Sequence, residues 1–452
     1  AQLADAIGTP FRDAQLGDGL PADILGLERA TIDDAANAST IILLGPDLKE
    51  ELPVLYLRLR DAAEKRRSRI IEFATFDTGM TPYAWTSLRY EPGSQQSVVA
   101  KALADADIAE QISSGDVVIV AGRPNLAESA DAAMAALRTL LDEIPGAKVL
   151  PALRRGNVVG ALSLGLAPAD ADHDAMSILA AAAEGRVELL VLLGADPLND
   201  CPDADLARRA IAGARRVLAV DTFPCESTQH ADVVLAGCAY GEKAGTTTNL
   251  EGRVTTVGQQ VTATGTSRPD WMIAVELGLM IGDRSFGADH PLRGVSTVDD
   301  VTEIIASSVG VFAAATPQAL ADAPDGVLTS PPVTPLAPVA FSAPGRNSYD
   351  YRLVVSRKLY DRAVGTQMSR SLVNLAPGSA IHVHPLDLDA LGVGEGDDVK
   401  VVSAKAATVL PIRANSTVPR GVVWSPFNQA EGTIEDIVDG RLPTTDVRIE
   451  RV

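Results

Sequence analysis

The chain has 452 residues, few cysteines and no long uninterrupted apolar run. Only three cysteines occur, Cys201, Cys225 and Cys238, which excludes a disulfide-rich fold and fits a cytoplasmic setting. No run of about 18 or more uncharged apolar residues appears, so we expect no segment that spans a bilayer. The chain does not begin with Met, and we expect upstream sequence to be missing.

Basic residues are also in the minority. Asp and Glu number 59 against 39 Lys and Arg, which gives a formal net charge of −20. This balance argues against nucleic acid or an anionic membrane surface as a direct partner, since both are polyanions. It is compatible with docking to basic protein surfaces, but most acidic proteins are simply soluble.

The spacing of the cysteines and histidines does not predict a metal centre. Iron–sulfur clusters need four ligands, mostly Cys, and no Cys-x-x-Cys is present, so we interpret the three cysteines as buried or incidental thiols. His382 and His384 would share one face of a strand, which makes a possible pair of ligands, but no third ligand is obvious nearby. No P-loop, G-x-S-x-G or G-x-G-x-x-G follows a predicted strand. We therefore predict no catalytic and no metal-binding residue.

Strand and helix patterns alternate over the first 315 residues. Short apolar runs predict strands at residues 41–44, 70–73, 117–121, 148–150, 189–193 and 217–220. Amphipathic stripes predict helices at residues 51–66, 127–141, 178–183 and 204–212. Repeated strand–helix units form parallel sheets that are covered on both faces, so we predict tandem Rossmann-like α/β domains.

The pattern changes after residue 315. Seven prolines fall within residues 316–347, a run that we expect to hold neither helix nor central strand and to act as a linker. Short strands at residues 353–356, 399–402, 408–412 and 421–424 then predict a small β-barrel. The predicted domains are a first α/β domain (1–160), a second with dinucleotide-type turns (161–315), the linker (316–347) and the barrel (348–452).

Residues 191–253 are the most informative stretch. Two predicted strands end at Gly194-Ala-Asp-Pro197 and at Asp221-Thr222. Because ligands bind off the carboxyl ends of parallel strands, these turns should lie on one rim of a sheet. The Gly-, Thr- and Asn-rich loop that follows Tyr240 has no obvious role in a core.

The same stretch resembles the molybdopterin oxidoreductase superfamily, in which a Gly-Ala/Glu-Asn/Asp-Pro turn and an Asp-ending strand hold a pterin dinucleotide. Within it, residues 41–60, 153–161 and 268–271 are similar to the G-subunit family of bacterial NADH-quinone oxidoreductases (respiratory complex I). Residues 356–366 and 384–399 resemble the C-terminal pterin-dinucleotide-binding barrel, of double-psi type. The resemblance runs from about Ser39 to the C-terminus.

The resemblance implies five residues for a dinucleotide cleft. Gly194, Asp196, Asp221, Asn249 and Arg253 could hydrogen-bond a guanosine and a pyrophosphate, or they could be kept because their loops need those conformations. Relatives of the G-subunit type generally keep this fold without the pterin, so we expect a vestigial, empty cleft. Active enzymes of the superfamily present Cys, selenocysteine or Ser to molybdenum from a region that has no counterpart here.

Three functions follow from these expectations. The first is a non-catalytic scaffold in the peripheral arm of complex I, on the cytoplasmic side of the membrane and bound to other subunits of the arm. That complex passes electrons from NADH through FMN on a partner subunit and through Fe–S clusters, expected upstream of this region, to a quinone, coupled to ion translocation. The second is a catalytic Mo or W enzyme with molybdopterin guanine dinucleotide, such as a formate dehydrogenase. The third is a free-standing interaction module.

Overall fold

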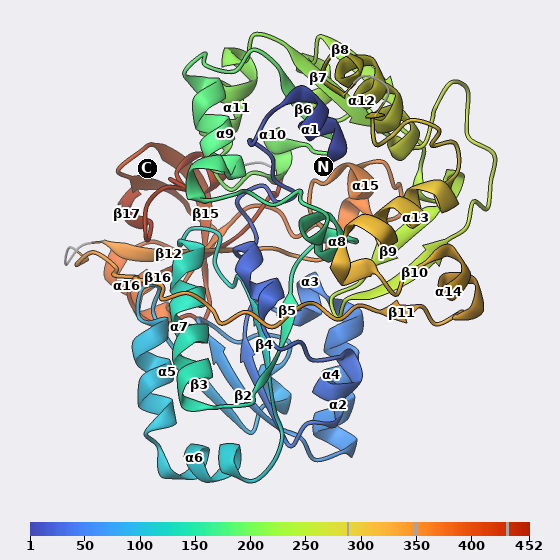
Figure 1. The fold of residues 1–452 in the computed structure, drawn as a ribbon. Helices are drawn as coiled ribbons and strands as arrows, with labels where there is room; N and C mark the ends of the chain where they lie inside the picture. The colour runs from blue at the N-terminus through green and yellow to red at the C-terminus, as the bar shows by residue number, and fades with distance from the viewer. Residues whose placement is uncertain (287–288, 347–349, 431–433) are drawn as a thin grey trace. The chain divides into compact units, whose positions relative to one another are not determined.

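The computed structural model describes residues 1–286, 289–346, 350–430 and 434–452. The chain forms two compact units, each assembled from three separate segments (Figure 1). Unit 1 consists of Ala1–Gly17, Arg155–Cys201 and Leu206–Pro332, and unit 2 of Asp18–Arg154, Pro202–Asp205 and Val333–Val452. The first α/β domain and the barrel thus belong to the same unit. The division of the chain into four contiguous domains stays a prediction.

A five-stranded parallel sheet is the centre of the α/β part of unit 2. Its order is β3-β2-β1-β4-β5, with β1 Thr40–Leu44, β2 Arg69–Ala74, β3 Thr86–Arg89, β4 Val117–Gly122 and β5 Lys148–Ala152. Every residue of β1 and β4 is buried, as expected of central strands covered on both faces. The four predicted strands are confirmed, and β3, an edge strand, was not predicted.

Helices cover both faces of this sheet (Figure 1). The helices α2 Ile32–Asn37 and α4 Pro53–Lys65 pack together on one face, and α5 Gln95–Leu103 and α7 Ala130–Glu143 on the other. In α7 the buried stripe of Met134, Leu137 and Leu140 recurs at helical spacing and faces the sheet. The remaining helices of unit 2 are α3 Leu48–Glu51, α6 Ala106–Ser113, α15 Val364–Gln367 and α16 Pro385–Leu391.

Six strands close a barrel in the C-terminal part of unit 2. Its order is β12-β16-β13-β15-β14-β17, with β12 Tyr351–Ser356, β13 Ile381–Val383, β14 Asp398–Ser403, β15 Ala407–Ala414, β16 Val422–Pro426 and β17 Asp446–Arg451. Branched aliphatic side chains such as Leu353, Val399 and Ile412 fill its interior and are fully buried. The predicted barrel is confirmed, although β13 and β17 were not among the strands predicted for it.

The amide side chain of Asn125 joins the sheet to the barrel within unit 2. Its Nδ2 donates to the Leu353 carbonyl oxygen at 3.0 Å, and its Oδ1 accepts from the N–H groups of Val355 and Ala127, both at 2.9 Å. The Leu126 N–H also donates to the Val355 carbonyl oxygen, at 2.8 Å. Asn125 is 1% exposed, so these bonds are shielded from water and losing one would leave a buried polar group unpaired.

A buried ion pair links the N-terminal segment of unit 2 to the residues that follow β12. The Arg357 guanidinium lies 2.8 Å from the Asp18 carboxylate, and both side chains are almost fully buried. The same guanidinium lies over the Phe427 ring at 4.3 Å. Nearby, burial raises the pKa of Glu435 to about 7, although the hydrogen bond from the Asn428 N–H and the charge of Arg357 lower it.

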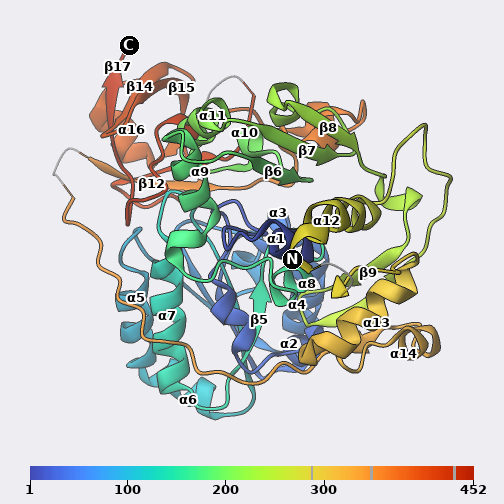
Figure 2. The same ribbon diagram turned by 45° about the horizontal axis from the view of Figure 1, so that its top comes forward.

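Unit 1 contains a second, smaller parallel sheet (Figure 2). Its order is β6-β7-β8, with β6 Leu190–Leu193, β7 Val217–Asp221 and β8 Val233–Ala236. The predicted strands at residues 189–193 and 217–220 are confirmed. The other helices and strands of this unit are α1 Gln2–Ile7, α8 Val158–Ser163, α9 Ala175–Ala183, α10 Pro197–Asp200, α11 Ala204–Gly213 from Leu206 onward, α12 Asp270–Phe286, α13 Val298–Ser308, α14 Pro317–Asp322, β9 Gly245–Thr248, β10 Arg253–Val257 and β11 Val327–Leu328.

This second sheet is not covered on both faces, and the prediction of full burial is wrong for it. Leu192 is 5% exposed and packs with Leu190, Ile211 and Val217, whereas its neighbour Leu193 is 47% exposed. Val233 and Val234 in the edge strand β8 are about half exposed. Successive residues of a strand point to opposite faces, so one face of β6 is buried, whereas on the other Val191 is partly exposed and Leu193 is exposed.

The proline-rich segment carries more regular structure than expected. Residues 317–322 form α14, because Pro317 occupies the first helical turn, where its missing N–H costs nothing, and Thr316 caps the helix. Val327 and Leu328 form the edge strand β11, which pairs with β10. Residues 329–346 form neither helix nor strand.

Among the described residues, no single helix is long and apolar enough to cross a bilayer. One pair of neighbouring helical segments, Val298–Ser308 and Gly310–Asp322, meets that test only when taken together, and it is bent by 116°.

The two faces of β6 give a matched test of the fold of unit 1. Leu192→Asp should lower the free energy of unfolding by about 4 kcal/mol, because it places a carboxylate in an apolar core. Leu193→Asp should change it by less than about 1 kcal/mol, because that side chain faces outward. Urea unfolding followed by circular dichroism measures both. Equal effects would show that the register of β6 is wrong.

The buried Glu435 predicts a pH-dependent loss of stability. Its folded pKa of about 7 lies above the ordinary 4.5, so between these values the unfolded state releases a proton that the folded state retains. Stability from this group therefore falls as pH rises through that window, by about 3 kcal/mol in all. Glu435→Gln cannot ionise and should gain about that much relative to wild type between pH 4.5 and pH 7.5.

Thermal and urea unfolding at pH 4.5, 6 and 7.5 give this difference directly. Glu110→Gln, at an exposed position of α6, is the control and should differ from wild type by the same amount at each pH. A flat difference for Glu435→Gln would contradict the assignment.

Candidate functional site

The predicted turns after β6 and β7 meet at one edge of the small sheet. The Gly194 N–H donates to the Val220 carbonyl oxygen at 2.8 Å, which holds the end of β6 against β7. Gly194 has φ +60°, a left-handed conformation in which side chains other than Gly are strained. No atom lies within 4 Å of where a Cβ would stand, so there is open space beside this residue.

Asp196 fastens the loop that follows β7 to the turn that follows β6. Its Oδ1 accepts from both the N–H and the hydroxyl of Ser227, at 3.1 and 2.5 Å. Its Oδ2 accepts from Asn199 Nδ2 at 2.7 Å. Both carboxylate oxygens are therefore used by neighbouring parts of the chain.

Asp221, at the end of β7, caps its own turn. Its Oδ1 accepts from the Thr222 N–H at 2.7 Å and lies 3.4 Å from the Phe223 N–H, while its Oδ2 lies 3.8 Å from the Cys225 sulfur. Burial raises the pKa of the Cys225 thiol, and the negative charges of Asp196 and Asp221 raise it further. A raised pKa leaves less thiolate, so Cys225 is a weaker nucleophile than an exposed thiol.

Asn249, in the turn that follows β9, and Arg253, the first residue of β10, lie together as a second cluster. Asn249 Oδ1 accepts from the N–H groups of Glu251 at 3.1 Å and of Arg253 at 2.9 Å. Arg253 Nε donates to Glu251 Oε1 at 2.7 Å, which neutralises its charge locally. Next to this turn, Asn157 Oδ1 accepts from the Thr248 N–H at 2.8 Å.

These contacts test whether the residues suit a pterin dinucleotide. A pyrophosphate requires N–H donors or cations, but Asp196, Asp221 and Asn249 offer mainly acceptor oxygens, and these already have partners. The guanidinium of Arg253 forms an ion pair with Glu251. The five residues therefore suit a role in holding their own loops, and they do not form a ready pyrophosphate site. Space is open beside Gly194.

The histidine pair considered as metal ligands does not form. His382 lies in β13 and stacks against the Trp424 ring at 4.4 Å, whereas His384 lies beyond the strand and caps α16 by accepting from the Leu386 N–H at 3.1 Å. The expected shared strand face is wrong because the strand ends at Val383. Within the described ranges, no three His, Cys, Asp or Glu side chains come together as a metal site would require.

Sequence reasoning missed the partners that hold the two clusters. Ser227 binds Asp196, Glu251 binds Arg253 and Asn157 binds the residue before Asn249. Asn157 has φ +65°, and the Arg-Gly-Asn segment that contains it was the only signal in the sequence. No sequence pattern indicates the role of Ser227, because it lies 31 positions after Asp196 and only the fold brings the two residues together.

The chain is similar in sequence to subunits of several oxidoreductases. At the sequence level the chain is 24% identical over 94% of its length to the NADPH-Fe(3+) oxidoreductase subunit alpha of Geobacter sulfurreducens. It is 27% identical over 97% to the G subunit of the NADH-quinone oxidoreductase of Streptomyces coelicolor. It is 25% identical over 64% to F420-dependent formate dehydrogenase 1 subunit alpha of Methanococcus maripaludis. It spans about half the length of these relatives, namely 58%, 53% and 49%.

The fold is shared with a solved structure and with two family models. Acetylene hydratase from Pelobacter acetylenicus superposes with a TM-score of 0.68 at 13% identity, over 100% of this chain and 81% of that one. The molydopterin dinucleotide binding domain model matches residues 351–446, which include the barrel. The molybdopterin oxidoreductase model matches residues 20–279, more than half of the chain. The chain therefore belongs to the molybdopterin oxidoreductase family.

Proposed function

We propose that this chain is the non-catalytic, molybdopterin-oxidoreductase-like region of the G subunit of an NADH-quinone oxidoreductase. In this role it is a scaffold in the peripheral arm, on the cytoplasmic side of the membrane, and its partners are other subunits of that arm. Electrons pass from NADH through FMN and Fe–S clusters to a quinone outside this region. The relatives that are named as G subunits, which match nearly the whole chain, support the proposal.

The observation that carries the proposal is the hydrogen bonding of the five cleft residues. The side chains of Asp196 and Asn249 form hydrogen bonds within the loops around them, and Arg253 is paired with Glu251. A vestigial cleft needs only such structural bonds, because its loops must keep their shape even when nothing binds there. We accordingly assign no catalytic residue and no resident cofactor to this region.

A catalytic role is the second candidate, and two observations favour it. The formate dehydrogenase relative matches 64% of the chain, and the space beside Gly194 is open. If a pterin were bound, it would supply the metal-centred redox chemistry, and this chain would only position it. Assay of molybdenum, tungsten and pterin in the whole native protein separates the two candidates, since the scaffold proposal expects less than a tenth of an equivalent of each.

Substitution of two cleft residues tests the scaffold proposal through turnover. Asp221→Ala and Asn249→Ala each remove local hydrogen bonds worth about 1 kcal/mol apiece, so NADH:quinone turnover per assembled complex should stay within about twofold of wild type. In a pterin enzyme the same changes would remove ligands of a charged cofactor, and turnover would collapse.

Asp232→Ala is the matched control. The Asp232 carboxylate also accepts from a backbone N–H, that of Val217 at 2.8 Å, but it is not one of the cleft residues. A severe loss of turnover in the Asp221 and Asn249 variants alone, with subunit stoichiometry and thermal stability intact, would overturn the scaffold proposal.

A further inference from the structure

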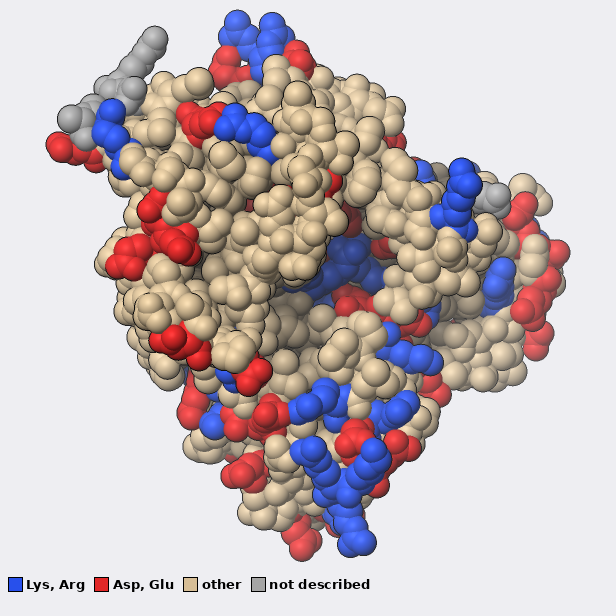
Figure 3. Space-filling view, turned by 90° about the vertical axis from the view of Figure 1, so that its right-hand side faces the viewer, with Lys and Arg blue, Asp and Glu red and all other residues tan. Residues whose placement is uncertain are grey.

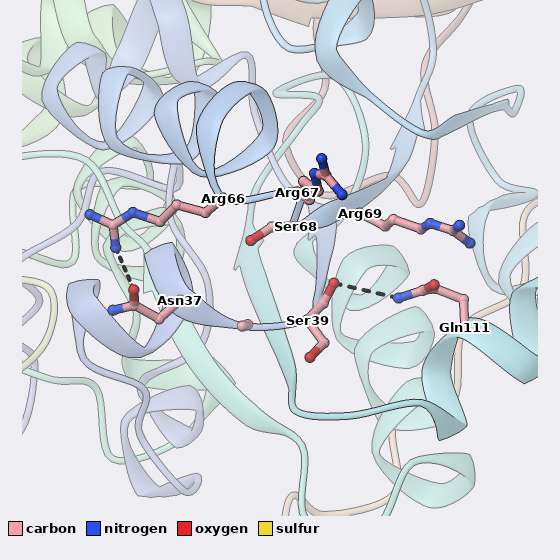
Figure 4. Close-up of a pocket in the computed structure, with 8 residues that line it drawn as sticks. Asn37, Ser39, Arg66, Arg67, Ser68, Arg69 and Gln111 are labelled. Atoms are coloured by element: carbon pink, nitrogen blue, oxygen red, sulfur yellow. Dashed lines mark hydrogen bonds between the residues drawn. The ribbon is translucent and has the colours of Figure 1, made fainter.

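A polar cavity of about 270 Å³ lies in unit 2, at the amino-terminal ends of β1 and β2 (Figure 4). This is the edge of the sheet opposite to the carboxyl edge, where ligands of parallel sheets usually bind. We call it the arginine pocket. Its lining consists of Asn37, Ala38, Ser39, Arg66, Arg67, Ser68, Arg69 and Gln111. Three of these eight side chains are cationic and none is a carboxylate, although the chain as a whole carries a net charge of −20.

Backbone bonds hold the arginine-rich loop in one shape. The N–H groups of Arg66 and Ser68 both donate to the Ala62 carbonyl oxygen, at 3.1 and 3.2 Å, which ends α4. Arg67 lies between them with φ +64°, and the Arg69 N–H donates to the Ser39 carbonyl oxygen at 3.0 Å, where β2 begins. The loop is therefore fixed without help from any guanidinium, so the three arginine side chains are not needed for its fold.

The cations of the pocket differ from those of the helix before it. Along α4, Arg58 pairs with Asp33, Arg60 with Glu64 and Lys65 with Asp61, so each charge has a carboxylate. Beyond the helix, Arg66 donates to the amide oxygen of Asn37 and interacts electrostatically with Asp61, whereas Arg69 lies over the Trp85 ring at 4.9 Å.

Arg67 has neither an ion pair nor a hydrogen bond within the described part of the chain and is exposed. A helix C-terminus attracts cations only within its last turn, which accounts for Lys65 and Arg66 but not for Arg67 and Arg69.

The directions of the side chains indicate the shape of the ligand. In Figure 4 the guanidinium groups of Arg66 and Arg69 point to opposite sides, and that of Arg67 points away from both. Three splayed cations cannot close around one small oxyanion, but they can each meet a different carboxylate along an extended segment. At the lower end of the face shown in Figure 3, over the part of unit 2 that holds α2 and α4, basic side chains lie interspersed with acidic ones.

We propose that the arginine pocket is a docking site for an acidic segment of a partner protein, whose carboxylates pair with Arg66, Arg67 and Arg69. The segment would supply the negative charge that the lining residues lack, and the polar walls formed by Ser39, Ser68 and Gln111 would keep water-mediated bonds to its backbone. This site is independent of the cleft and of the redox role proposed above.

Trp85 provides a built-in reporter, because the Arg69 guanidinium stacks on its ring and would shift when a carboxylate binds. The full chain is titrated with a hexaglutamate peptide, and separately with inorganic phosphate, while tryptophan fluorescence and heat are recorded at low salt. We expect the peptide to bind, to weaken as salt is raised, and to bind at least tenfold more tightly than phosphate. Trp85→Phe should remove the fluorescence change but keep the heat of binding.

Charge reversal distinguishes a site from general attraction. Arg67→Glu should weaken peptide binding at least tenfold, whereas Arg370→Glu, the same change at an exposed position outside the pocket, should alter it less than twofold. Both variants should show wild-type melting, since neither residue holds the fold. Equal weakening by the two variants, tighter binding of phosphate than of peptide, or no peptide binding at all would each overturn the proposal.

Discussion

The side chain of Asn125 is the contact on which the architecture of unit 2 most depends. It bonds to β12 through both its amide nitrogen and its amide oxygen, as a neighbouring strand would, although it belongs to the segment between β4 and α7. Leu126 and Ala127, the two residues that follow, enter the hydrophobic core of the barrel. The sheet and the barrel therefore share buried polar bonds and a common apolar interior, and the Arg357–Asp18 ion pair adds a second buried attachment.

The elements of the core could be predicted from the sequence because their signals are local. The strands β1, β2, β4 and β5 are short apolar runs bounded by polar residues, and the predicted bounds agree to within about two residues. Strands β9 and β10 were missed because Thr-rich segments lack that contrast. The helix α14 was missed because prolines were read as breakers, whereas Pro at the first helical position is favourable.

The candidate cleft was predictable only in part. The rule that loops meet at the carboxyl edge of a parallel sheet correctly brought Gly194, Asp196 and Asp221 together. What each side chain bonds to depends on loops that approach from elsewhere in the chain, such as the one that carries Ser227. The arginine pocket could not be predicted for a similar reason. A run of arginines in the sequence does not show whether carboxylate side chains lie next to it in the folded chain.

The interleaving of the two units has a consequence for synthesis. Asn125 and its acceptor Leu353 are 228 residues apart, and most of unit 1 is encoded between them. At about 5–20 residues per second, the ribosome takes on the order of 10 to 45 s to deliver β12 after Asn125 has emerged. Throughout that interval Leu126 and Ala127 have no barrel to enter, so two residues that are buried in the finished protein stay exposed while unit 1 is being synthesised.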